Sequence, residues 1–265
     1  MKIGFIGLGN MATAIIGGIL QNNVVEPQNI IGSDALSTAM ENIKTKFNIT
    51  TVINNIEVAK QADILFLAVK PLYVPDVMKD IKDVVSKDTI VVSIVAGKTI
   101  EYLTEQFGRT DVKIVRCMPN TPALVLAGCT GVCAGENVTT EELDKVLAIL
   151  RCFGTANVVP ERLMDVVVGI SGSSPAYVFM FIEAMADEAV AEGMPRAQAY
   201  EFAAQAVLGS AKLVLETKKH PGELKDMVCS PGGTTIQAVK VLEELGMRAA
   251  VMDAMEACIE KSRQL

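Results

Sequence analysis

Hydroxyl groups and glycines gather at Ser230-Pro231-Gly232-Gly233-Thr234-Thr235, immediately before a helical pattern over residues 236–240. The unpaired N–H groups of a helix N-terminus and the positive end of the helix dipole meet in such a turn, so it can hold an anion. The segment contains no Lys or Arg, and a small carboxylate therefore fits it as well as a phosphate does. A simple Ser or Thr N-cap after a glycine turn would have the same sequence. The motif alone leaves both interpretations open.

A second glycine turn, Gly7-Leu8-Gly9-Asn10-Met11-Ala12, follows the apolar run 3–6 near the start of the chain. Its spacing is G-x-G-x-x-A, a form of the fingerprint that binds dinucleotides between a strand and a helix. The first glycine makes the turn, the second lets a pyrophosphate approach the backbone, and the small third residue lets helix and strand pack closely. The spacing is a weak signal, but the strand pattern before it and the helical pattern over residues 10–20 favour a nucleotide site over a merely structural turn.

The composition argues against several classes of function. Half of the 265 residues are hydrophobic, yet no run approaches the roughly 20 uninterrupted apolar residues of a membrane span. A net charge of −7 without a basic patch argues against a nucleic-acid partner. Six cysteines without a C-x-x-C pair, and a single histidine, leave little to bind a metal ion. Since Met1 leads directly into a strand pattern without a signal peptide, we expect a cytoplasmic enzyme with reduced thiols and no metal, nucleic-acid or membrane partner.

The first 160 residues alternate between strand-like and helix-like patterns. Runs rich in β-branched residues and separated by helices are typical of a parallel sheet covered on both faces, which binds ligands at the carboxyl ends of its strands. We therefore predict an α/β fold in which residues 1–160 form a Rossmann-type, doubly wound, mostly parallel dinucleotide-binding domain. The expected strands are 3–6, 30–31, 64–69, 90–94, 113–116, 131–134 and 157–159, and the expected helices are 10–20, 35–47, 74–85, 99–107 and 141–153.

Strand patterns end at Pro160, and helical patterns bounded by proline or glycine follow. We predict an all-helical domain over residues 161–265 that binds substrate and dimerises. Residues 177–182 are apolar on every side, and such a helix must be covered all round. We expect a homodimer that buries helices across subunits, with cover by the Rossmann-type domain as the alternative. The expected helices are 176–192, 195–217, 223–228, one from Thr234 or Thr235 to Gly246, and 247–263.

Five segments follow one another in the order found in one enzyme family. They are the glycine turn 7–12, Ala68-Val69-Lys70-Pro71, the loop sequence 116–122, Gly172-Ser173-Ser174-Pro175-Ala176-Tyr177, and His220–Asp226 with the turn 230–235. Through them the chain resembles pyrroline-5-carboxylate reductase from end to end. The last segment is highly specific, whereas the first is shared with many dehydrogenases.

This resemblance implies the last step of proline biosynthesis. A hydride from NADPH, or from NADH, passes to the C=N carbon of 1-pyrroline-5-carboxylate and gives L-proline. The resemblance also implies a Rossmann domain, a helical dimerisation domain, an active site shared across the dimer, and dimers that often assemble as five into a decamer.

Reduction of a cyclic imine depends largely on positioning a hydride near the carbon and keeping the ring nitrogen protonated. A protonated imine is already electrophilic, so a strong acid such as His or Lys is not compulsory. The resemblance places the substrate carboxylate on the amides of Gly232, Gly233 and Thr234. It makes Thr235 the catalytic residue, whose hydroxyl bonds the ring nitrogen. Glu161 matches a position near bound proline in relatives, although an exposed loop carboxylate would look the same.

Cofactor contacts follow from the resemblance position by position. They comprise the pyrophosphate turn, the adenosine side, the end of the third expected strand and the nicotinamide side. Without the resemblance, Lys70 would be interpreted as a solvated loop charge. The pyrophosphate turn comprises Ile6, Gly7, Leu8, Gly9, Asn10 and Met11, and the adenosine side comprises Ser33 and Asn55. The end of the third expected strand comprises Ala68, Val69, Lys70 and Pro71, and the nicotinamide side comprises Val95, Ala96 and Gly97.

Two positions depart from the family pattern, and two other functions remain open. Asp34 stands where some relatives carry Arg for a 2′-phosphate, so it favours NADH unless its side chain points to solvent. Met227 replaces a polar residue of some relatives.

A reductase of the β-hydroxyacid dehydrogenase kind would need a catalytic lysine in the second domain, for which Lys212 is the central candidate. In a non-catalytic nucleotide-sensing module, the turn 230–235 would be idle.

Overall fold

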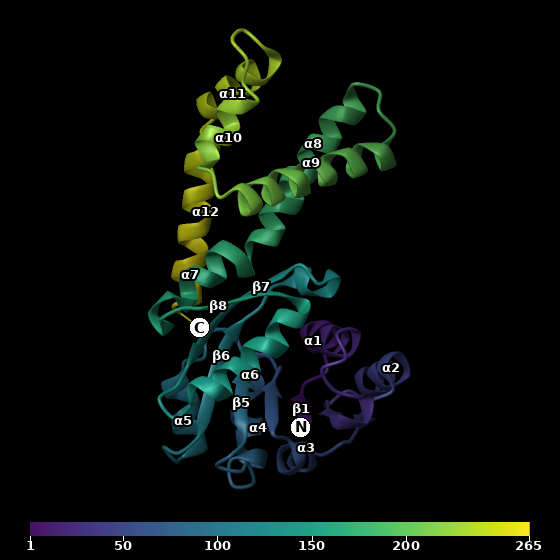
Figure 1. The fold of residues 1–265 in the computed structure, drawn as a ribbon, viewed down its shortest axis with the longest axis vertical. Coiled ribbons are helices and arrows are strands. Elements are labelled where there is room, and N and C mark those ends of the chain that lie inside the picture. The colour runs from purple at the N-terminus through teal and green to yellow at the C-terminus, as the bar shows by residue number, and fades with distance from the viewer. Residues whose placement is uncertain (265) are drawn as a thin grey trace. The chain divides into compact units, whose positions relative to one another are not determined.

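The computed structural model describes residues 1–264 and divides into two compact units. The first unit comprises Met1–Ser173 with the C-terminal residues from Cys258, and the second comprises Ser174–Ala257. Within the described residues, all strands belong to the first unit and the second is helical (Figure 1). The boundary between the two units falls after Ser173. The expected boundary after Pro160 concerns domains that fold separately, and it stays a prediction.

One eight-stranded sheet organises the first unit, with the strand order β3-β2-β1-β4-β5-β6-β7-β8. Neighbouring strands are parallel except for β6 and β7, which are antiparallel. The order of the chain reverses between β1 and β4, and such a switch point is where doubly wound sheets bind ligands. The predicted mostly parallel, doubly wound sheet is confirmed. The strands are β1 (Ile3–Ile6), β2 (Ile30–Ser33), β3 (Thr50–Thr51), β4 (Ile64–Leu67), β5 (Ile90–Ser93), β6 (Lys113–Met118), β7 (Gly128–Ala134) and β8 (Gly154–Val158).

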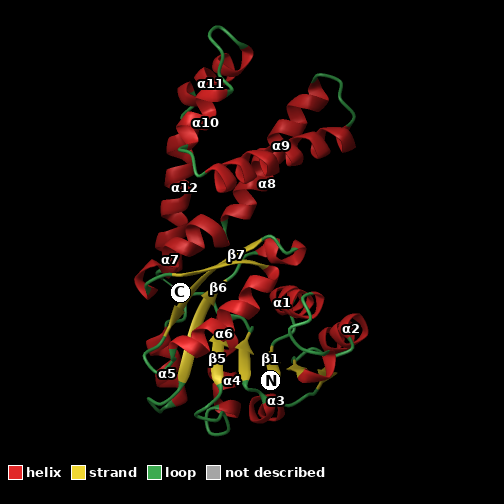
Figure 2. Ribbon diagram, viewed as in Figure 1, coloured by secondary structure: helices red, strands yellow, loops and turns green. Residues whose placement is uncertain are grey.

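Helices cover both faces of this sheet, because successive strand residues point to opposite sides (Figure 2). Ile3 and Phe5 of β1 pack in the apolar cluster formed with α1, α2 and α6, and the Phe5 ring stacks on Phe66 at 4.8 Å between centroids. Ile6 packs on the other face with α3, α4 and α5. The helices are α1 (Asn10–Gln21), α2 (Ser37–Phe47), α3 (Asn55–Gln61), α4 (Val74–Ile81), α5 (Ile100–Phe107) and α6 (Thr140–Leu150).

Local capping signals set several helix ends. Thr139 and Glu142 form a reciprocal capping box at the start of α6. Gly108 ends α5 in the left-handed region with φ 65°. The helix expected to reach residue 153 ends at Leu150, where a 3₁₀ turn leads into β8. The sequence analysis missed β3 and α3, because β3 has only two residues and the Asn54 N-cap of α3 looks like a loop.

The helices after Pro160 are close to those predicted. A short helix, α7 (Met164–Val167), runs into a π-helical turn at Val168–Gly172. Ser262, near the end of α12, donates to Asp165 at 2.7 Å and so fixes the C-terminal turn in the first unit. The remaining helices are α8 (Ser174–Ala191), α9 (Arg196–Thr217), α10 (Pro221–Met227), α11 (Thr234–Glu244) and α12 (Met247–Ser262).

The second unit buries very little of its apolar surface. Of residues 174–257, all of them described, only Ala186, Ala199, Ala203 and Leu224 are buried. Phe179 is 61% exposed in α8. By length and composition, the continuous helical run Glu161–Ala191 is long and apolar enough to span a membrane. A single helix of this kind is weak evidence for a membrane span. This unit therefore has no core of its own and presents helices that need a partner.

Candidate cofactor and substrate sites

The first glycine turn is held against the ends of two strands. The N–H of Gly7 donates to the carbonyl of Ser33 at 2.8 Å, and the N–H of Ala68 donates to the carbonyl of Ile6 at 2.8 Å. Gly7 has φ 93°, and a Cβ on it would lie 2.6 Å from the Ala68 oxygen. Only glycine fits this position. The structure thus brings together the predicted residues Ile6, Gly7, Ser33 and Ala68.

The N-terminus of α1 is open beside this turn. Gly9 is the N-cap, no side chain caps the helix, and the first turn carries no acidic residue. A Cβ on the exposed Gly9 would meet no atom within 4 Å. The N–H groups of Asn10 and Met11 lie in the first turn and have no acceptor within the helix. A pyrophosphate fits this cradle, since it needs N–H donors, a positive helix end and open space.

Asp34 is tied to the glycine turn. Its Oδ2 accepts from the N–H of Leu8 at 2.7 Å, and its Oδ1 accepts from the N–H of Leu36 at 2.9 Å. The sequence from Ser33 to Ile43 contains no Lys or Arg. The position after β2 is where an adenosine ribose lies in this fold, so a 2′-phosphate there would meet the Asp34 carboxylate.

Asn55 links Ser33 to a neighbouring helix. The Ser33 hydroxyl donates to Asn55 Oδ1 at 2.7 Å, and Asn55 Nδ2 donates to Asp80 Oδ2 at 3.0 Å. Both polar atoms of the Asn55 amide are therefore used inside the protein, and its predicted contact to the cofactor stays a prediction. Lys70 is exposed at the start of the Pro71–Tyr73 turn after β4.

The loop after β5 contains the residues assigned to the nicotinamide side. The N–H of Val95 donates to the Ser93 hydroxyl at 3.3 Å, and Gly97 has φ 72°. Thr99 caps the following helix, its hydroxyl accepting from the N–H of Tyr102 at 3.0 Å. This loop leaves the carboxyl end of β5, at the edge of the sheet where ligands bind.

Glu161 has two partners that the sequence analysis missed. Its Oε1 accepts from Arg116 Nη1 at 3.0 Å and from the N–H of Ile100 at 2.8 Å. The Arg116 side chain is 6% exposed and that of Glu161 is 33% exposed. The alternative interpretation of Glu161 as a solvated loop carboxylate is therefore wrong. A charged residue inside the apolar strand 113–118 was the available signal, because a buried arginine needs a counter-ion.

The cysteine beside this ion pair is not a nucleophile. Cys133 of β7 lies opposite Arg116 of β6. Burial raises the pKa of the Cys133 thiol to about 12, with Glu161 adding to the rise and Arg116 opposing it. Burial also raises the pKa of the Cys117 thiol. Both thiols are neutral at pH 7, so neither supplies the thiolate that nucleophilic chemistry requires.

The second glycine turn begins α11. The N–H of Gly233 donates to the carbonyl of Ser230 at 3.0 Å, and a Cβ on Gly233 would lie 2.4 Å from the Ser230 hydroxyl oxygen. Gly232 has φ 70°. Gly233 is the N-cap of α11 and no side chain caps this helix, so the alternative of a Ser or Thr N-cap is wrong. Among the described residues, the hydroxyls of Thr234 and Thr235 have no hydrogen-bond partner.

This geometry changes one detail of the predicted anion site. Gly233 was expected to offer its amide to a carboxylate, whereas in the structure that N–H closes the turn. The N–H groups of Thr234 and Thr235 lie in the first turn of α11, where no carbonyl within the helix can accept them. We therefore expect these two donors, with Gly232, to form the site.

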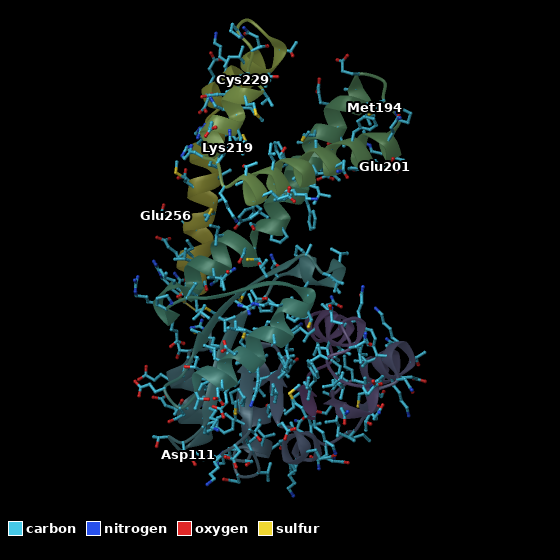
Figure 3. All side chains as sticks on the ribbon, in the orientation of Figure 1. Asp111, Met194, Glu201, Lys219, Cys229 and Glu256 are labelled. Carbon is cyan, nitrogen blue, oxygen red and sulfur yellow. The ribbon has the colours of Figure 1, made fainter. Side chains whose placement is uncertain are left out.

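The short helix before this turn is also fixed at its start. His220 is the N-cap of α10, and its Nδ1 accepts from the N–H of Gly222 at 3.0 Å. Figure 3 labels Lys219 and Cys229, which lie on either side of α10. Met227, at the end of α10, is 63% exposed. His220 is therefore a capping residue.

Two sequence models of families match the chain. Pyrroline-5-carboxylate reductase dimerisation matches residues 161–265, and NADP oxidoreductase coenzyme F420-dependent matches residues 2–97. The pyrroline-5-carboxylate reductase of Escherichia coli (strain K12) is 56% identical over 264 residues, which cover 100% of this chain and 98% of the relative. That of Methanosarcina acetivorans is 45% identical, over 100% of this chain and 97% of the relative. The chain belongs to the pyrroline-5-carboxylate reductase family.

Solved structures of pyrroline-5-carboxylate reductases have the same fold. The Plasmodium falciparum enzyme with NADP bound has a TM-score of 0.90 at 33% identity, over 100% of this chain and 97% of that chain. The Coxiella burnetii enzyme has a TM-score of 0.91 at 34% identity, over 99% and 97%. A 3-hydroxyisobutyrate dehydrogenase of Mycobacterium tuberculosis reaches 0.51 at 14% identity, which shows a related fold alone.

Lys212 does not support the rival reductase of the β-hydroxyacid dehydrogenase kind. Its side chain is 68% exposed in α9 and pairs with Glu216 at 3.6 Å. A catalytic lysine of that kind would be expected in a pocket that perturbs its charge. Lys212 therefore lacks the surroundings expected for that role within the described part of α9.

The open cradle at α1 predicts different effects for its two glycines. Gly9→Ala should weaken NADP⁺ binding at least about tenfold, because the methyl group enters the space for the pyrophosphate while meeting no protein atom. Its melting temperature should stay near that of the wild type. Calorimetric titration with NADP⁺ and thermal unfolding measure the two quantities.

Gly7→Ala is the contrasting variant. It should lower the melting temperature as well as the affinity, because its Cβ would clash with the Ala68 carbonyl. Wild-type affinity in Gly9→Ala would place the pyrophosphate elsewhere.

Proposed function

We propose that this chain reduces 1-pyrroline-5-carboxylate to L-proline with NADPH or NADH, the last step of proline biosynthesis. The observation that carries the proposal is the open N-terminus of α11, with two unbonded threonine hydroxyls, in a chain 56% identical to a named pyrroline-5-carboxylate reductase. We place the enzyme in the cytoplasm.

The carboxylate of the substrate binds at the start of α11. The amides of Thr234 and Thr235 and the positive end of the helix dipole supply its counter-charge. No lysine or arginine lies in the turn 230–235, so the site favours one small carboxylate over a more highly charged phosphate. Gly232 and Gly233 keep side chains away from the bound acid.

Thr235 holds the ring nitrogen. Its hydroxyl has no hydrogen-bond partner among the described residues, so it is free to bond the protonated imine and, after reduction, the amine. This bond orients the C=N carbon. A bound nicotinamide supplies the hydride, which forms the new C–H bond as the C=N π electrons move to the ring nitrogen and leave a secondary amine.

The cofactor is held by the first glycine turn and the loops around it. The amides of Asn10 and Met11 would bind the pyrophosphate, the end of β2 would receive the adenosine ribose, and Val95–Gly97 would border the nicotinamide. NADP was bound in the Plasmodium falciparum relative, and the pyrophosphate that the N-terminus of α1 would hold is common to NADPH and NADH. The carboxylate of Asp34 affects whether NADPH or NADH is preferred.

Thr235→Ala should reduce turnover by about 10²-fold or more. The melting temperature should not change, because the hydroxyl bonds no described protein group. Thr235→Ser is the matched control: it keeps the hydroxyl and should retain most of the activity. The loss of NADPH absorbance with pyrroline-5-carboxylate measures the rates, and unchanged kinetics in Thr235→Ala would remove this residue from the mechanism.

Asp34→Asn should raise kcat/KM for NADPH relative to NADH about fivefold. Two like charges at ~4 Å in water repel by about 1 kcal/mol, which corresponds to that factor. The Asn oxygen can still accept from the N–H of Leu8, which keeps the contact to the glycine turn, while the second bond, from the N–H of Leu36, is lost. Steady-state kinetics with both cofactors gives the ratio.

Glu41→Gln is the control for this test, since it removes an exposed charge from α2 without any contact to the turn. A ratio that changes equally in both variants would mean that Asp34 acts only through net charge.

The exposed helices of the second unit imply self-association, and we propose a homodimer as its unit, with five dimers forming a decamer. Phe179→Glu should shift the protein towards monomer, because it introduces a charge into an apolar helix face. Sedimentation velocity at micromolar concentration measures the change.

Ile53→Glu is the control for the dimer, because Ile53 is 87% exposed in the first unit and should not affect assembly. A wild-type protein that sediments only as a monomer would refute the dimer.

A further inference from the structure

The ion pair of Arg116 and Glu161 lies where the sheet ends, close to the loop after β5. Arg116 of β6 pairs in register with Ser93, the last residue of β5. Its guanidinium lies 3.0 Å from Glu161 Oε1, and the same oxygen lies 2.8 Å from the backbone nitrogen of Ile100. Ile100 is the first residue of α5. The carboxylate therefore joins β6 to the start of α5.

The loop between β5 and α5 is fixed at both ends. At its start, Val95 donates its N–H to the Ser93 hydroxyl at 3.3 Å. At its end, Thr99 caps α5 and Glu161 accepts from Ile100. Between these points the chain turns through Gly97, with φ 72°. The loop is short and its backbone is hydrogen-bonded at both ends, so its path depends on the position of Ile100.

The charges of the pair explain why both members are needed. A buried guanidinium requires a counter-ion, and removal of one partner leaves the other charge unpaired. A carboxylate at a helix N-terminus is also stabilised by the helix dipole. Glu161 satisfies both conditions through one oxygen, so a change at Arg116 also changes how firmly Ile100 is held.

We propose that Arg116 and Glu161 are positioning residues that hold the loop 94–99 against the nicotinamide through the N–H of Ile100. Glu161 acts through this loop and does not bind the substrate. The inference rests on the proposed function for its kinetic consequences. Its structural consequences can be measured without turnover.

The test compares Arg116→Met, Glu161→Ala and the double variant with the wild type. Three quantities are measured in the full-length protein: the Kd for NADP⁺ by calorimetry, kcat and KM with pyrroline-5-carboxylate, and hydrogen exchange of the backbone amides over residues 95–102. Arg116→Lys is included as the conservative variant.

A second ion pair on the same strand provides the matched control. Lys113, at the amino end of β6, lies 2.5 Å from Glu142 of α6, and their side chains are 20% and 16% exposed. Lys113→Met and Glu142→Gln therefore remove a partly buried ion pair from β6 at the opposite end of the strand. These variants should lower the melting temperature without changing cofactor affinity.

Each single variant of the proposed pair should weaken NADP⁺ binding and reduce kcat about tenfold or more, because small displacements of a reacting group are costly. KM for pyrroline-5-carboxylate should stay within about twofold, since this pair does not touch the substrate. The double variant should resemble the single variants, as expected for residues that act as one unit. Exchange at Ile100 should become faster, and Arg116→Lys should recover part of the affinity.

Two results would overturn the proposal. A rise in KM for pyrroline-5-carboxylate in Glu161→Ala, with unchanged NADP⁺ affinity, would make Glu161 a substrate ligand. Variants that lose only thermal stability, as the Lys113 control does, would make the pair purely structural. A wild-type protein inactive with pyrroline-5-carboxylate would refute the proposed function, while NADP⁺ affinity and exchange would still decide the role of the pair.

Discussion

One row of residues, paired from strand to strand across the sheet, determines where the ligand-binding loops begin. Five parallel strands in register bring one residue each to the same level, which is the last residue in β1, β2, β4 and β5, and β7 continues the row in antiparallel register. Polar side chains in this row hold the following segments: the serine of β2 bonds α3, the serine of β5 bonds its own loop, and the arginine of β6 bonds the carboxylate before α7. The row consists of Ser33, Ile6, Leu67, Ser93, Arg116 and Cys133.

The sequence was informative wherever a feature is local. The two glycine turns, the order of strands and helices, and the proline-bounded helices of the second unit each depend on a few consecutive residues, and the structure has them close to the predicted positions. Short elements were lost: β3 has two residues, and the Asn54 cap of α3 was not recognised. Family resemblance supplied the functional assignment that these patterns could not.

Contacts between distant residues could not be predicted in this way. Glu161 bonds Arg116 and Ile100, which are 45 and 61 positions away, and Asp34 bonds Leu8, 26 positions away. Only the folded sheet brings these groups together. The sequence showed that a charged Arg116 occupied an apolar strand, but not which carboxylate would neutralise it. Similarly, the apolar helix 177–182 indicated missing cover without identifying the surface that supplies it.

Two helices of this protein begin at a glycine cap. Side chains cap α3, α5, α6 and α10, namely those of Asn54, Thr99, Thr139 and His220. Helices α2, α4 and α9 also lack a side-chain cap and begin at Leu36, Tyr73 and Pro195. Only α1 and α11 among these begin at glycines, Gly9 and Gly233, which place no side chain over the helix N-terminus. A glycine cap stabilises a helix less than a Ser, Thr, Asn or Asp cap by only about a few tenths of a kcal/mol, so each open N-terminus forgoes a small stabilisation in the free protein. Cofactor and substrate can restore it by accepting from the same N–H groups, and a ligand that binds only the folded state stabilises that state. The glycine caps of α1 and α11 therefore lower the stability of the enzyme without ligands, and they make its stability depend on ligand binding.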